Sequence, residues 1–152
     1  MKDMKTILIT LLLIVGIVLP TTTACSSADS HQHEMADLAD MPMSLQQSPV
    51  RVQEAYQFAV ANPEITQAIP CYCGCGPMGH TSNYSCYVAD EATNGTLTFD
   101  EHALSCGICV DITQDTMQML DEGVSVEEMF EIIDGRYAHF GPPTPLDGAL
   151  SN

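Results

Sequence analysis

The sequence lacks tryptophan, has few other aromatic residues and contains very few basic residues. Trp 0, Phe 4 and Tyr 5 among 152 residues mean that a folded core must rely on aliphatic side chains. A domain of this size gains from cross-links or a bound metal. Lys and Arg number 4 against 20 Asp and Glu, so the formal net charge is -16. Such a surface repels phosphates, which excludes nucleic-acid binding and membrane attachment through a basic patch.

One long apolar run is present, at the N-terminus. Lys2 and Lys5 precede the run Ile7 to Leu19, and small residues follow as far as Ala24. A charged start, an apolar centre and small residues before a cleavage point predict a secretory signal peptide over residues 1–24. The run is shorter than the roughly 20 apolar residues that a membrane-spanning helix needs.

Cys25 follows this segment, at the position of the lipidated cysteine in bacterial lipoprotein signals. Thr22 stands three residues earlier, where such signals usually carry Leu, so cleavage after Ala24 without lipidation and an uncleaved N-terminal anchor stay open. We expect a lipid on Cys25, because acyl chains hold a soluble domain at a membrane surface. All three alternatives place the domain outside the cytoplasm, and lipidation places it on the outer face of the cell membrane.

The two flanks of the chain predict little regular structure. Residues 25–48 are polar and acidic, which predicts a disordered tether behind the anchor. Residues 141–152 begin with Gly141-Pro142-Pro143 and are expected to form a loose tail. The tether contains residue types that bind copper, although chance composition of a polar spacer is the preferred interpretation. These residues are His31, His33, Met35, Met41 and Met43.

The intervening residues 49–140 predict a small, mostly α-helical domain. Apolar spacing and breaker residues predict helices over 49–61, 63–69, 101–122 and 126–137. A Gly- and Cys-rich loop is expected over 71–85, and Asn94-Gly95 predicts a turn between short strands at 84–89 and 96–99. The expected N-caps of three of the helices are Ser48, Asp100 and Ser125. The fold class is therefore a helical domain with a Cys-rich loop and a short β-hairpin.

Six cysteines remain after Cys25, and two histidines lie near them in sequence. Cys106 and Cys109 form a CxxC pair, and His102 would share their face of the predicted helix at spacings of four and seven residues. Clustered thiolates select Cu(I), Zn(II) or iron–sulfur clusters, of which the last is hard to justify outside the cytoplasm. We expect copper(I) first and zinc second, with His80 and His102 as auxiliary ligands. The expected thiolate ligands are Cys71, Cys73, Cys75, Cys86, Cys106 and Cys109.

Two other interpretations of the cysteines stay open. Six cysteines in a small exported domain ordinarily form disulfides, which would make the protein a structural or interaction module. Alternatively, the CxxC pair could serve a thiol–disulfide oxidoreductase, but its predicted place inside a helix, after Asp100 and Glu101, disfavours an activated thiolate. The sequence has no GxSxG, HExxH or phosphate-loop motif, so we do not expect an enzyme.

The segment Pro70 to Cys75, Pro-Cys-Tyr-Cys-Gly-Cys, resembles the motif that names the PCYCGC-motif (lipo)proteins of bacteria. The resemblance extends over about Pro49 to Tyr137. The resemblance implies export, lipid attachment and this architecture, and it implies no activity. The chain departs from the lipoprotein signal at Thr22, which concerns only the lipid anchor. Further matching elements are Gly79-His80, Ser82-Asn83, Cys86, His102, Cys106 to Cys109, Ile133-Asp134 and Tyr137.

Overall fold

The computed structural model describes residues 33–146. The predicted signal peptide, Cys25, His31 and the last six residues of the tail lie outside the described residues. Within the described part, no helix is long and apolar enough to cross a membrane. The helices are α2 (Met43–Gln46), α3 (Val50–Ala61), α4 (Pro63–Ala68), α5 (Gly107–Asp121) and α6 (Val126–Tyr137). The strands are β1 (Val88–Glu91) and β2 (Leu97–Phe99), and short 3-10 turns are η1 (Leu38–Asp40), η2 (Gly76–Met78), η3 (Tyr84–Cys86) and η4 (His102–Leu104).

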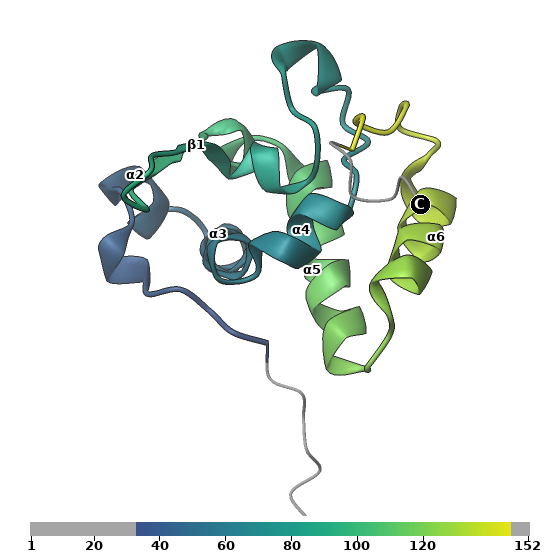
Figure 1. Ribbon diagram of the computed structural model, residues 1–152, viewed down its shortest axis with the longest axis horizontal. Helices are drawn as coiled ribbons and strands as arrows, with labels where there is room; N and C mark the ends of the chain where they lie inside the picture. The colour runs from purple at the N-terminus through teal and green to yellow at the C-terminus, as the bar shows by residue number, and fades with distance from the viewer. Residues whose placement is uncertain (1–32, 147–152) are drawn as a thin grey trace, which may run out of the picture.

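Three helices, α3, α5 and α6, form the frame of the domain. Figure 1 shows α3 nearly end-on at the centre, with α5 and α6 beside each other to its right. α5 packs on both α3 and α6. The small side chains of Ala55 and Ala59 are fully buried on α3 together with Tyr56 and Phe58, so the helices approach closely. The predicted mostly α-helical class with a short hairpin is confirmed.

The junction after α3 directs the chain toward the cysteines. α3 ends at Asn62 because the residue before Pro63 is disfavoured in the helical conformation, and Pro63 then begins α4. These bounds agree with the predicted helices. The predicted N-cap of α3 is wrong, because Pro49 occupies the cap position and the Ser48 hydroxyl instead donates to the carbonyl of Leu45, 2.7 Å away.

The β-hairpin begins later than its sequence predicts. β1 and β2 pair antiparallel, with Val88 opposite Phe99 and Glu91 opposite Leu97. The predicted first strand includes Tyr84 to Cys86, but these residues form η3. This tight turn buries the Cys86 side chain, whereas an extended strand would carry it along the hairpin.

The predicted helix over 101–122 is broken into two elements. η4 is followed by an extended Cys106, with φ -108° and ψ 98°, which is the N-cap of α5. Asp100 accepts a hydrogen bond from the backbone N–H of His102 at 2.7 Å and lies just before Glu101, the N-cap of η4, so it does not cap a long helix. The expectation that His102, Cys106 and Cys109 share a helical face is therefore wrong. At the other end Gly123, with φ 75°, follows α5 as predicted.

The predicted tether does not extend to residue 48. Residues 33–48 run alongside α3, where the N–H of Ala36 donates to the Gln57 carbonyl at 3.0 Å. Met41 and Leu45 are buried in the core. Their apolar side chains are sparse among polar neighbours, so composition alone does not reveal that they pack. Met41 is thus a core residue, and His33 lies 2.8 Å from Asp121 rather than in a copper site.

The predicted loose tail is also ordered at its start. Thr144 is 4% exposed and exchanges two hydrogen bonds with Cys71. Its hydroxyl accepts from the Cys71 N–H at 2.9 Å, and its own N–H donates to the Cys71 carbonyl at 2.9 Å. Residues 141–146 therefore fasten the first cysteine of the motif to the body of the domain.

Candidate metal centre

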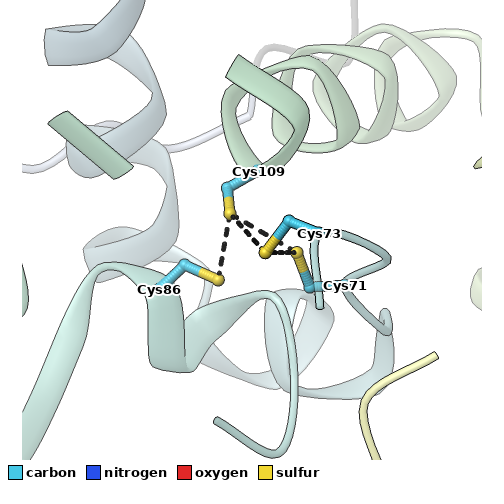
Figure 2. Close-up of side chains that lie close together, drawn as sticks. All are labelled: Cys71, Cys73, Cys86 and Cys109. Atoms are coloured by element: carbon cyan, nitrogen blue, oxygen red, sulfur yellow. Dashed lines mark hydrogen bonds between the residues drawn. The ribbon is translucent and has the colours of Figure 1, made fainter. Parts of the chain in front are cut away.

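Four cysteine sulfurs meet at one point in the interior. Cys71 and Cys73 come from the loop after α4, Cys86 from η3, and Cys109 from the first turn of α5 (Figure 2). The Sγ atom of Cys109 lies 3.4 Å from that of Cys71, 3.6 Å from that of Cys73 and 3.3 Å from that of Cys86. All four Sγ atoms lie within 4.8 Å of one another. We call this group the buried position.

These separations suit a metal ion better than disulfides. Bonds of about 2.3 Å to a tetrahedral ion place thiolate sulfurs about 3.8 Å apart, close to the separations seen here. A disulfide would require about 2.05 Å between two sulfurs. Within the described residues all six cysteines are free thiols, so the disulfide pattern is not formed.

The loop reaches this point because of its glycine and its anchors. Gly74 has φ 81°, a conformation that a residue with a side chain rarely adopts, and it lies between Cys73 and Cys75. The turn lets the Cys73 side chain face the Cys109 sulfur. Cys75 instead lies beside Cys86, with 3.9 Å between their sulfurs. Cys71 is held by Thr144 as described above.

Cys109 is positioned by a buried polar network. Its carbonyl accepts from the Asn83 amide at 3.2 Å and from the Tyr87 hydroxyl at 2.9 Å. The Thr113 hydroxyl donates to the Asn83 side-chain oxygen at 2.7 Å. All three side chains are at most 1% exposed, and buried polar groups with satisfied hydrogen bonds specify one arrangement. The position of the Cys109 sulfur is therefore fixed by residues that are not ligands.

A second group of possible ligands overlaps the first. His102 Nε2 lies 3.4 Å from the Sγ atom of Cys73. The ligand atoms of Cys73, His102, Cys106 and Cys109 all lie within 4.8 Å of one another. His102, Cys73 and Cys106 are partly exposed, unlike the other cysteines. We call this group the rim position.

His80 and Cys75 lie next to Cys86, one of the four cysteines of the buried position. His80 is 6% exposed, and its Nδ1 lies 3.6 Å from the Cys86 sulfur while its Nε2 lies 3.4 Å from Asp100. Cys75, His80 and His102 form a third group with ligand atoms within 4.8 Å. A carboxylate next to one ring nitrogen of a histidine fixes the orientation of the ring, so the other nitrogen can face a metal ion. All eight predicted ligand residues thus belong to one continuous cluster.

The thiols influence one another's protonation. The hydrogen bond with Cys109 lowers the pKa of Cys73 and also that of Cys71. The contact with Cys109 raises the pKa of Cys86, and the contact with Cys71 raises the pKa of Cys109. Burial raises the pKa of Cys106. A cluster in which only some thiols ionise readily releases further protons when a cation binds, because metal ligands must be deprotonated.

Sequence reasoning missed three residues that shape the site. Asp100 was expected only as a helix cap, yet it faces His80 and accepts the Tyr56 hydroxyl on its backbone carbonyl at 2.6 Å. Tyr87 and Thr144 were given no role. No local pattern marks them, since each contacts a residue more than twenty positions away. Asn83 was marked only by the family resemblance.

The fold and the site together define a small helical domain built around a thiol cluster. The chain belongs to the family described as "Protein of unknown function with PCYCGC motif", which matches residues 11–147. The resemblance seen in the hexapeptide is thereby confirmed. No curated protein and no solved structure matches the chain.

Proposed function

We propose that this protein binds a soft metal ion, copper(I) first and zinc second, and sequesters it or passes it on outside the cytoplasm. The observation that carries the proposal is the convergence of the Sγ atoms of Cys71, Cys73, Cys86 and Cys109 within 4.8 Å. Three separate segments of the chain supply these thiols, and the loops between them are held by buried hydrogen bonds. Such an arrangement satisfies the donor set that soft cations prefer.

Charge and burial support a cation at this point. Thiolates in a water-poor interior are costly unless they are paired. The neighbours that can compensate thiolate charge are the start of α5, where Cys109 is the third residue, and the rings of His80 and His102. A bound cation would supply the missing positive charge. The acidic exterior would raise the local concentration of cations near the site.

Copper(I) is preferred over zinc because of the number of thiols. One tetrahedral zinc ion uses four ligands, whereas the cluster offers six thiols and two imidazoles. Copper(I) needs only two or three thiolates for each ion, so the six thiols could hold more than one copper(I) ion. The proposed setting is the outer face of the cell membrane, with the domain held by a lipid on Cys25. We propose no enzymatic activity for the thiols.

A thiol–disulfide exchange activity is the second candidate. The CxxC pair, disfavoured when placed inside a helix, in fact begins α5, the position where such thiols are activated. Against this candidate, burial raises the pKa of Cys106, and Cys109 contacts three other sulfurs rather than being free to react. The metal proposal accounts for those contacts, and the exchange activity does not.

The test is metal content, measured by elemental mass spectrometry together with thiol titration. The full chain is purified without oxygen from copper-replete and zinc-replete cells. The proposal expects a stoichiometric ion that is lost in Cys73→Ser and in Cys109→Ser but retained in Thr98→Val, at an exposed strand position. Fully oxidised cysteines with no metal would contradict it. Turnover of a dithiol substrate without metal would favour the exchange activity.

A further inference from the structure

The buried and rim positions share half of their ligands, and this overlap has a functional meaning. Cys73 and Cys109 belong to both positions. The buried position adds Cys71 and Cys86, which are 0% exposed. The rim position adds His102 and Cys106, which are partly exposed.

We infer that the rim position is the entry port of the centre, at which an incoming soft cation is first captured and then handed inward. The inference rests on the proposed function and adds the route by which the site is loaded. The ion would stay bound to the shared pair, Cys73 and Cys109, whose sulfurs lie 3.6 Å apart (Figure 2). It would exchange the two rim ligands for the two buried ones, so no step would leave it without protein ligands.

Access supports this direction of movement. A surface groove lies between the segment before α3 and the start of α5, and Cys106 lines it. Other residues that line this groove are Pro49, Val52, Leu104 and Val110. No residue that lines the groove belongs to the buried position. The two cysteines that belong only to the buried position, Cys71 and Cys86, have no exposed surface. A cation arriving from solvent or from a donor protein therefore meets Cys106 and His102 before Cys71 and Cys86.

The exchange forms and breaks only bonds between the ion and its ligands. Each thiol that binds gives up the proton it carries, and the Cys106 thiolate that leaves takes one up. No oxidant or reductant is required, since the ion keeps its charge.

The test separates the rate of loading from the final occupancy. Copper(I) is supplied to the full chain as a coloured chelator complex, without oxygen, and loss of the chelator colour is followed by stopped-flow absorbance. Elemental analysis gives the final content. We expect Cys106→Ser and His102→Gln to load about tenfold or more slowly than the unaltered chain, since they lack capture ligands, but to reach the same final content. Thr98→Val, at an exposed strand position away from the groove, should load at the unaltered rate.

The buried variant should show the reverse behaviour. Cys86→Ser keeps the rim ligands, so capture should stay fast while the ion returns to excess chelator about tenfold or more faster. Unchanged loading in both rim variants, or loss of the ion from both at equilibrium, would overturn the entry port while leaving metal binding intact. Absence of binding in the unaltered chain would instead overturn the proposed function. Circular dichroism identifies a variant that fails to fold, and the other rim variant then decides.

Discussion

The helical frame and the cysteine loop are both buried, but different interactions hold them. α3 and α5 meet through Ala55, Ala59 and other apolar side chains, and their backbone groups are satisfied within each helix. The segment from Cys71 to Cys86 contains only the short turns η2 and η3. Its buried side chains include thiols, His80 and Asn83. The frame is stabilised by removing apolar surface from water, whereas the loop depends on hydrogen bonds and contacts between sulfurs.

This difference shows where a metal would matter. The frame contains what it needs for stability, because apolar burial and helical hydrogen bonds require no ligand. The sulfurs of Cys71 and Cys86 in the loop lie against the sulfur of Cys109 at the start of α5. The proposed cation would stabilise this contact between thiols. The two regions should therefore respond unequally when metal is removed.

Metal removal is the change with the largest expected effect. At free metal about 1,000-fold above the dissociation constant, binding stabilises the folded state by about 4 kcal/mol, which chelation would abolish. Denaturant unfolding with and without chelator measures this loss. Hydrogen exchange should show faster opening chiefly in peptides covering Cys71 to Cys86, and less change in α3. Equal change in both regions would contradict the comparison.

The sequence predicted the frame better than the loop, for a physical reason. Helix positions follow from local periodicity and from breakers such as Pro63 and Gly123, which act on their own neighbours. The break before α5 leaves Cys106 extended beside Cys73, which is far from it in sequence, and local periodicity does not encode such a contact. The eight candidate ligand residues could be named from their types and spacing, and the structure brings them together. Their division into buried and rim positions required the three-dimensional arrangement.

The segment before α3 belongs to the frame, although its composition predicts a tether. Leu45 is fully buried, and Leu45→Ala should lower the free energy of unfolding by about 3 kcal/mol, through lost burial and the cavity left behind. Met43, in the same helix, is 62% exposed, so Met43→Ala is the matched control and should change stability little. Denaturant unfolding of both variants measures the effect. A Leu45→Ala variant as stable as Met43→Ala would place this segment outside the folded unit.

Metal content of these two variants refines the comparison between frame and loop. The four sulfurs of the buried position come from residues 71–109, and α2 supplies none of them. Leu45→Ala should therefore retain a stoichiometric ion under conditions where it remains folded. Loss of the ion in a folded Leu45→Ala variant would show that the frame and the loop are coupled more tightly than their separate interactions imply.

The contact between Thr144 and Cys71 joins the two regions and has the smallest expected effect. Thr144→Val keeps the shape of the side chain but removes the hydroxyl that accepts from the Cys71 N–H. Leaving this buried donor without a partner should cost about 1–2 kcal/mol of unfolding free energy. Thr98→Val, at an exposed strand position, is the control. Cys71 belongs to the buried position and not to the rim position. Thr144→Val should therefore also release metal to a chelator faster than Thr98→Val does, while the rate at which the rim position captures metal stays unchanged. Equal release rates would show that Cys71 is held by the sulfur cluster alone and that residues 141–146 contribute nothing to the centre.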